Sequence, residues 1–293
     1  MTNICETAGF TKPGVQADPA PGASGTATAP GRNVLLRIAY DGTDFSGWQI
    51  QSSLPSIQGH LAEAFARASG VHIHVCGAGR TDAGVHALGQ AASIRMNSPI
   101  PAANLVKALN DHLPESIRIL SAVDVPWTFH AQRDAVAKTY CYRLHRATIC
   151  SPWVVRYVTP YPYPLDEAAM IAAAPLVSGT HDFRSLASAD ESDARLTKTY
   201  VRTIFESKLE RAGDELVYTV RGDGFLTHMV RNIVGLLIEI GRHRRRMEEI
   251  VTILAARDRQ AAGPTAPARG LHLVSVEYSG VEYSDFAGQI RLK

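Results

Sequence analysis

The chain has 293 residues and is 45% hydrophobic, so it can fill the core of one large domain or two medium ones. Its 30 basic and 28 acidic side chains leave a formal net charge of only +2. This balance excludes a protein that binds nucleic acid through its overall charge, so any such surface must come from local clusters. The longest apolar run, Ile233 to Ile240, contains Glu239 and is too short to cross a bilayer, and we expect no membrane partner.

The first 32 residues are rich in Ala, Gly, Pro and Thr and hold almost no large apolar side chains. They cannot bury enough apolar surface to offset the entropy of ordering, so we expect a disordered tail over residues 1–32. The four cysteines form no Cys-x-x-Cys pair and no evident disulfide framework. This pattern, with polar residues after Met1, is typical of a reduced, cytoplasmic protein.

The next stretch, residues 33–127, alternates strand and helix patterns. Ile57, Leu61 and Phe65 recur every fourth residue, with Ser56 placed to cap the helix and Gly70 to end it. Strict alternation of apolar residues predicts the neighbouring strands. In chain order we expect strands over 34–40, 71–75 and 117–125, and helices over 57–69 and 101–110.

A second half covers residues 128–283, followed by a C-terminal tail over 284–293. Its first strand places Lys138, Tyr140 and Tyr142 on one face. Asp166 is placed to cap a helix that Pro175 kinks or ends early. Beyond it we expect a hairpin of strands over 201–210 and 215–221, an amphipathic helix over 230–240, a shorter helix around 250–254 and a last strand over 271–278. Strands and helices interleave in both halves, which indicates α+β or α/β layers.

The string from Gly77 to Ala87, GAGRTDAGVHA, is the most informative feature of the sequence. Its three glycines predict a tight connection between two strand-like segments. Arg80 and Asp82 lie two residues apart, so in extended backbone they project to the same side. A short Gly-Arg-x-Asp string is most often a surface turn with a local ion pair, but the whole string is far less common.

Residues 80–87, RTDAGVHA, resemble the signature of the tRNA pseudouridine synthase A family. Further matching strings follow in the family's order, from about Asn33 to Tyr278. They are YDGT (40–43), GWQ (47–49), IQ (57–58), KTYCY (138–142), GTHDF (179–183), RTI (202–204), GFLTHMVRNIVG (224–235) and APARGL (266–271).

This resemblance implies an α+β pseudouridine synthase fold, in which two similar α/β halves share a largely antiparallel sheet with helices packed on it. The active cleft is expected between the halves. The implied activity is the isomerisation of uridine to pseudouridine at positions 38, 39 and 40 of the tRNA anticodon stem-loop, by a homodimer. We expect no cofactor and no metal, because the isomerisation needs neither redox chemistry nor external energy.

The resemblance also assigns roles to individual residues. Asp82 becomes the catalytic aspartate, and whether it attacks the base, attacks C1′ or removes the C2′ proton stays open. Arg231 becomes its ion-pair partner, which favours the carboxylate anion. Tyr140 is expected to stack on the uracil and to take part in removing the C5 proton. Arg80 is expected to contact the phosphate or to fill the space that the flipped nucleotide leaves.

Two further sets of basic residues are candidates for RNA contact. Lys138 is either a phosphate ligand or an ordinary solvated strand lysine. Arg244 and Arg245 belong to the run RHRRR (242–246), which follows the predicted helix at 230–240. Cations favour the C-terminal end of a helix, but four arginines exceed what capping needs, so we favour phosphate contacts.

Two alternative functions remain at this point. One is a metal-dependent hydrolase that uses His72, His74, Asp82 and His86, since a His-x-His strand can bind zinc. The other is a catalytically inactive tRNA-binding module of the same fold. The presence of Asp82, Tyr140 and Arg231 together favours catalysis.

Overall fold

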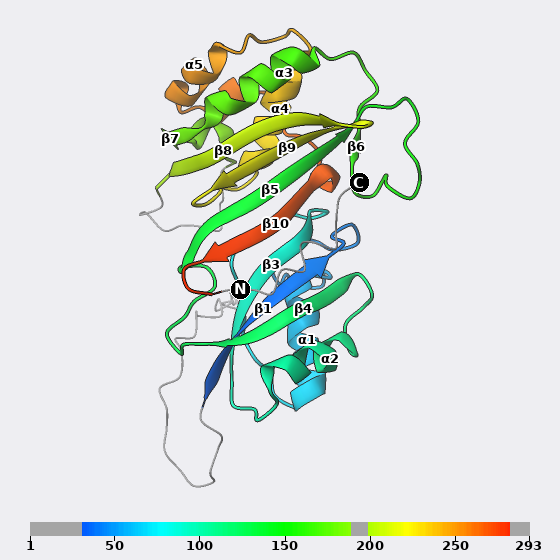
Figure 1. Cartoon of the computed structure of the whole chain (residues 1–293), viewed down its shortest axis with the longest axis vertical. Helices are drawn as coiled ribbons and strands as arrows, with labels where there is room; N and C mark the ends of the chain where they lie inside the picture. Colours follow the sequence, from blue (N-terminus) through cyan, green and yellow to red (C-terminus); the bar gives the residue numbers. More distant parts are fainter. Residues whose placement is uncertain (1–30, 189–198, 282–293) are drawn as a thin grey trace, which may run out of the picture.

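The structure, a computed structural model, describes residues 31–188 and 199–281 (Figure 1). Ten strands in these residues form one sheet, in the order β4-β1-β3-β10-β5-β9-β8-β7, with β2 paired to β3 and β6 paired to β5. The strands are β1 (Arg32–Tyr40), β2 (Val75–Gly77), β3 (His86–Met96), β4 (Ile117–Val125), β5 (Ala135–His145), β6 (Thr159–Pro160), β7 (Gly179–Asp182), β8 (Val201–Ala212), β9 (Glu215–Gly222) and β10 (Leu271–Tyr278). The helices are α1 (Ile57–Ser69), α2 (Ala102–Asn110), α3 (Glu167–Ala173), α4 (Met229–Gly241) and α5 (Glu249–Ala256).

The sheet is largely antiparallel, as the family resemblance predicts. Its parallel pairs are β3 with β10 and β5 with β6. Strand β10, from the end of the described chain, lies between β3 and β5 (Figure 1). It therefore joins the strands of the first half, β4-β1-β3, to those of the second, β5-β9-β8-β7. The predicted α+β class is confirmed.

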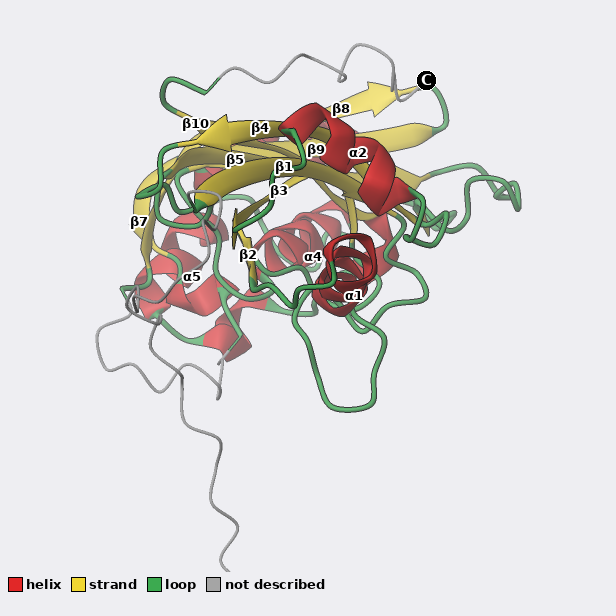
Figure 2. Ribbon diagram, turned by 90° about the horizontal axis from the view of Figure 1, so that it is seen from below, coloured by secondary structure: helices red, strands yellow, loops and turns green. Residues whose placement is uncertain are grey.

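The helices pack on the sheet through apolar faces. Figure 2 shows α1, α4 and α5 on the same side of the sheet. Helix α4 is the most deeply embedded, with eleven of its thirteen residues buried. Burial of its aliphatic side chains supplies much of the driving force that holds this layer in place. The site described below forms where the N-terminal end of α4 meets the loop after β2.

Local signals predicted several element boundaries correctly. The Ser56 side chain accepts a hydrogen bond from the Gly59 amide at the start of α1, and Gly70 ends the helix with a left-handed φ of 72°. Asp166 caps α3 by accepting from the Ala169 amide, and α3 stops at Ala173, two residues before Pro175. The hairpin of β8 and β9 and the last strand also lie where the pattern placed them.

One predicted strand is mostly wrong. The alternation from Val71 to Val75 predicted a strand, but regular pairing begins only at Val75. Val71, His72 and His74 are exposed, so this alternation does not mark a buried face.

Of the predicted tails, residues 1–30 and 284–293 lie outside the described residues, whereas Arg32 belongs to β1 and pairs with Asp124.

Candidate active site

A cleft of about 970 Å³ lies where the loop after β2 meets β5 and the segment that precedes α4. Four of the predicted site residues line this cleft, namely Arg80, Asp82, Lys138 and Tyr140. Arg231 lies next to it at the start of α4 and contacts Asp82. The structure therefore brings the predicted catalytic trio together from segments that are far apart in the chain.

Asp82 and Arg231 form the predicted ion pair. The Arg231 Nη1 atom donates to Oδ2 of Asp82 at 2.8 Å, across 149 residues of sequence. The Asp82 side chain is 28% exposed and that of Arg231 15%, so the pair is poorly screened by water and yet open to the cleft. The guanidinium thus holds one oxygen of the carboxylate at the edge of the cleft.

The loop that carries Asp82 is held by its neighbours on both sides. The Thr81 hydroxyl contacts the Tyr40 hydroxyl at 2.8 Å, and the Thr81 carbonyl accepts from the Trp48 amide at 3.0 Å. Gly47 makes this approach possible, because a Cβ atom there would lie 2.6 Å from the Thr81 carbonyl oxygen, and its φ is +93°. The resulting framework fixes the backbone from which Asp82 reaches the cleft.

Arg231 is also held by hydrogen bonds to the segment around Ala266. Its Nε atom donates to the Ala266 carbonyl at 2.8 Å, while the Ala266 amide donates to the Arg231 carbonyl at 3.1 Å. The chain around Ala266 approaches α4 closely because position 235 is glycine, where a Cβ atom would lie 1.8 Å from the Pro264 carbonyl oxygen. Asn232 strengthens this contact, since its side-chain oxygen accepts from Thr265 at 2.7 Å. The guanidinium is thus oriented before any substrate arrives.

Tyr140 forms an aromatic wall of the cleft. Its ring lies edge-on to Phe225, with centroids 5.0 Å apart, and the residue is 7% exposed. Burial, with the negative charge of Asp82 and the nearby Tyr40 phenol adding to it, raises the pKa of the Tyr140 hydroxyl well above its usual range. The phenol therefore stays neutral at physiological pH, so it can stack and donate a hydrogen bond but is a weak base.

The two predicted cations of the cleft differ in their environment. Lys138 is half-buried, and its Nζ donates to the Ala78 carbonyl at 2.7 Å. Burial, assisted by the charge of Arg202, lowers the pKa of Lys138 to about 8. Arg80 is exposed at the cleft surface. Lys138 thus supports the loop that leads to Asp82, whereas Arg80 is free to reach a phosphate.

Arg244 and Arg245 are not brought to this cleft. Helix α4 has 13 residues, so its two ends are separated by about 20 Å, and these arginines follow the far end. They lie next to acidic side chains, Arg244 at 3.7 Å from Glu239 and Arg245 at 3.4 Å from Glu249. Any RNA contact through them would occur at a distance from the reacting nucleotide.

His228, which lies in the matching string 224–235 and was expected to be structural or to contact RNA, also contacts Asp82. It precedes α4 with a left-handed φ of 60°, and its Nε2 lies 3.4 Å from Oδ2 of Asp82. The available signal was its position three residues before Arg231, which places both near one end of a helix. Phe225, the aromatic partner of Tyr140, was missed in the same segment.

The other candidate histidines lie elsewhere. His86 is buried, where it accepts from the Gly42 amide at 3.1 Å and contacts the Arg156 carbonyl at 3.0 Å. Within residues 31–188 and 199–281, no group of three or more His, Cys, Asp or Glu side chains is arranged to hold a metal ion. The zinc-site hypothesis with His72 and His74 therefore has no support in the described part of the chain.

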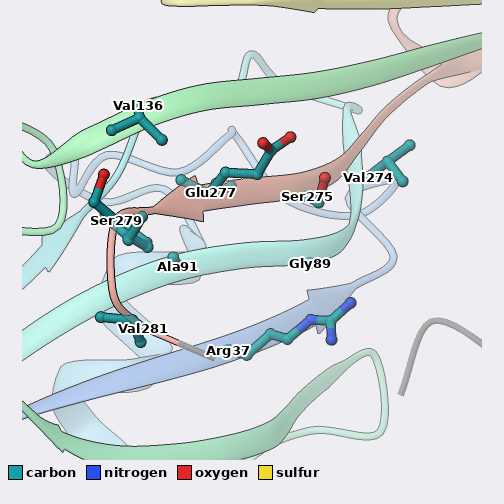
Figure 3. A pocket seen from close by; sticks show the side chains of 11 residues that line it. Arg37, Gly89, Ala91, Val136, Val274, Ser275, Glu277, Ser279 and Val281 are labelled. Atoms are coloured by element: carbon teal, nitrogen blue, oxygen red, sulfur yellow. The ribbon is translucent and has the colours of Figure 1, made fainter. Parts of the chain in front are cut away.

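A second cavity, of about 480 Å³, lies over β10 and its neighbours (Figure 3). Its acidic residue, Glu277, accepts two hydrogen bonds from Arg221, at 2.8 and 2.6 Å. Its lining contains neither Asp nor His. The chemistry of the Asp82 cleft is absent there.

Comparison with known proteins identifies the family of this chain. The sequence pattern of the tRNA pseudouridine synthase family matches residues 37–133 and 173–279. The chain belongs to this family. The tRNA pseudouridine synthase A of Solibacter usitatus is 51% identical over 84% of this chain and 100% of its own length. Those of Halalkalibacterium halodurans and Brevibacillus brevis are each 44% identical over 82% of this chain, and over 90% and 97% of their own lengths.

Membership confirms the family and the enzyme class expected from the sequence. The protein is a pseudouridine synthase, an isomerase. Asp82, Arg231 and His228 all lie inside the two matched segments, whereas Tyr140 lies between them.

In the described residues, no helix has both the length and the apolar character needed to cross a membrane.

Proposed function

We propose that this synthase converts uridine to pseudouridine in tRNA, at positions 38, 39 and 40 of the anticodon stem-loop, with Asp82 as the catalytic residue. The observation that carries the proposal is the Asp82–Arg231 ion pair in a cleft with an aromatic wall. The names of the relatives support tRNA as the substrate, since each is a tRNA pseudouridine synthase A.

The reaction is an isomerisation, so the product contains the same atoms as the uridine. The N1–C1′ bond breaks, the uracil turns, and a C5–C1′ bond forms, after which C5 loses a proton and N1 carries one. Asp82 assists as the anion, by attack on the base, by attack on C1′ or by removal of the C2′ proton. Arg231 binds Oδ2 at 2.8 Å, and we propose Oδ1 as the oxygen that acts on the nucleotide.

The other residues hold the nucleotide outside its helix. Stacking on an aromatic ring contributes about 1–3 kcal/mol per base. Extruding a base costs a few kcal/mol, so stacking on Tyr140 does not suffice alone. We propose that Arg80 and Lys138 contribute the remainder through the RNA backbone near the cleft, and that Arg244 and Arg245 contact phosphates farther away.

We also propose that residues 33–127 and 128–283 form the two halves of the catalytic domain, because the cleft takes side chains from both. The enzyme is proposed to act in the cytoplasm as a homodimer. Sedimentation equilibrium tests the dimer directly, since one chain has a mass of 31.7 kDa. A species of that mass at micromolar concentration would contradict the dimer.

The decisive experiment measures tritium release from tRNA that carries C5-labelled uridine. We expect release by the wild-type enzyme and none by Asp82→Asn, with tRNA affinity retained because the amide keeps the shape of the side chain. Asp44→Asn is the matched control, since the Asp44 side chain is 73% exposed and pairs with Arg156 away from the cleft. Absence of release by the wild type would indicate an inactive tRNA-binding module instead.

A cellular experiment is needed to test which tRNA positions the enzyme modifies. Pseudouridines are mapped in tRNA from cells that lack this protein, with and without rescue by the wild type or Asp82→Asn. We expect loss at positions 38, 39 and 40, restored by the wild type alone. Modification elsewhere in the tRNA would overturn the assignment of the anticodon stem-loop.

A further inference from the structure

His228 connects Asp82 to a serine outside the known motif strings. Its Nε2 lies 3.4 Å from Oδ2 of Asp82, which is an electrostatic contact rather than a short hydrogen bond. Its Nδ1 lies 2.8 Å from the Ser188 hydroxyl. Ser188 is anchored in turn, because its amide donates to the Thr227 carbonyl at 3.0 Å. Asp82, His228 and Ser188 therefore form a continuous chain of polar contacts.

The contact with Asp82 decides which imidazole nitrogen carries the proton. A neutral histidine has one N–H, and the hydrogen bond at one nitrogen sets the role of the other. If Nδ1 carried the proton, the lone pair of Nε2 would face the carboxylate of Asp82, which is repulsive. With the Ser188 hydroxyl donating to Nδ1, Nε2–H points to Oδ2. By donating to Nδ1, the serine thus stabilises the form of His228 whose Nε2–H faces Asp82.

Two donors then converge on one oxygen of the Asp82 carboxylate. Arg231 donates to Oδ2 at 2.8 Å, and His228 faces the same atom. Among residues 31–188 and 199–281, Oδ1 has no hydrogen-bond or ion-pair partner. A hydrogen bond from Arg231 and a second positive or N–H group at the same oxygen restrict rotation of the carboxylate, which favours one direction for the other oxygen.

We propose that His228 and Ser188 are positioning residues, which fix Oδ2 of Asp82 so that Oδ1 is presented to the target nucleotide. This inference rests on the proposed function of Asp82. The backbone agrees with a constrained role, because His228 is one of four described non-glycine residues with positive φ. Such conformations cost about 1–3 kcal/mol and persist only where the surroundings impose them.

Two substitutions at position 228 distinguish the contact made by Nδ1 from the contact made by Nε2. His228→Asn puts an amide near the position of Nδ1, so it keeps the contact with Ser188 and no longer reaches Asp82. His228→Gln puts its amide near the position of Nε2, so it keeps the donor to Asp82. Asparagine also tolerates a left-handed φ well. The control is His181→Asn, because His181 Nε2 makes a comparable contact with the Ser178 carbonyl outside the cleft.

The readouts are the single-turnover rate of pseudouridine formation, the Kd for tRNA and the stability to urea, measured on the full chain. We expect His228→Asn to lower the rate by about tenfold with Kd unchanged, because it removes the polar contact that helps to orient the Asp82 carboxylate. We expect His228→Gln to stay within about threefold of the wild type. Equal rates for wild type and His228→Asn, or equal losses for the two variants, would overturn the inference.

Ser188→Ala tests whether the serine stabilises the donor form of His228, without altering the residue that has the left-handed φ. We expect it to slow the wild-type enzyme by about threefold and to leave His228→Gln unaffected, since an amide has no tautomer to select. Equal slowing in both backgrounds would overturn the role of Ser188. An active Asp82→Asn enzyme would instead refute the proposed function, so the two failures are distinguishable.

Discussion

The two ends of α4 carry positive charge in different ways. At the N-terminal end a single guanidinium, that of Arg231, binds Asp82 with its side chain 15% exposed. At the C-terminal end the run RHRRR (242–246) is the densest cationic segment of the sequence, and the Arg246 side chain is 83% exposed. Asp82, the proposed catalytic residue, lies at the end with one arginine.

The difference shows that local density of charge does not locate an active site. Exposed charges are screened by water and salt within about 10 Å, so a run of arginines acts mainly on a polyanion as a whole. A half-buried arginine with two fixed partners acts on one atom. We therefore expect the two ends of α4 to affect different quantities, the rate at one end and the affinity at the other.

The largest effect is expected at the N-terminal end. Arg231→Gln should lower the single-turnover rate by on the order of 100-fold or more, because the charge that stabilises and orients Asp82 is removed. The Kd for tRNA should change by less than about threefold, which filter binding measures. Equal losses of rate and affinity would contradict the assigned role.

Gly235→Ala tests how the middle of the same helix supports Arg231. Alanine favours helices over glycine, so propensity alone predicts stabilisation by about 1 kcal/mol. The clash with the Pro264 carbonyl predicts the reverse, a loss of about 1–3 kcal/mol in the free energy of unfolding, together with a slower reaction. Urea denaturation decides the sign. Val251→Ala, at a position 66% exposed on α5, is the control.

At the C-terminal end the double variant Arg244→Gln/Arg245→Gln should change affinity rather than rate. The salt dependence of tRNA binding, log K against log salt, should become shallower by about 1 for each phosphate that is no longer neutralised. The single-turnover rate at saturating enzyme should stay unchanged. An unaltered salt slope would show that these arginines serve only Glu239 and Glu249.

A smaller effect distinguishes Lys138 from the arginines. Burial depresses the pKa of this amine to about 8, so its positive charge disappears as the pH rises through that value. The Kd for tRNA should therefore rise by about threefold between pH 7 and pH 9, since one ion pair with a phosphate is removed. The step should be absent in Lys138→Met and present in Lys107→Met, a control at a side chain that is 82% exposed. A pH-independent wild-type Kd would show that Lys138 does not bind the RNA backbone.

Features that depend only on residues close together in the sequence were predictable from it. The cap at Ser56, the left-handed end at Gly70 and the early stop before Pro175 depend on backbone chemistry within one turn. The strand predicted over Val71 to Val75 was mostly wrong because its formation depends on distant parts of the chain. Alternation marks a strand only where one face is buried, and whether a sheet covers that face is decided elsewhere in the chain.

The sequence by itself determined the family, because one contiguous string around Asp82 and several ordered motifs suffice to identify it. The tertiary structure alone decided that Arg231 and His228 share one oxygen of Asp82, and that the loop after β2 meets α4 at the end away from Arg244 and Arg245. A sequence specifies which side chains exist and where the chain turns locally. Which atoms meet depends on the sheet register, on the path of α4 and on the close approach at Gly235, which are properties of the packed molecule.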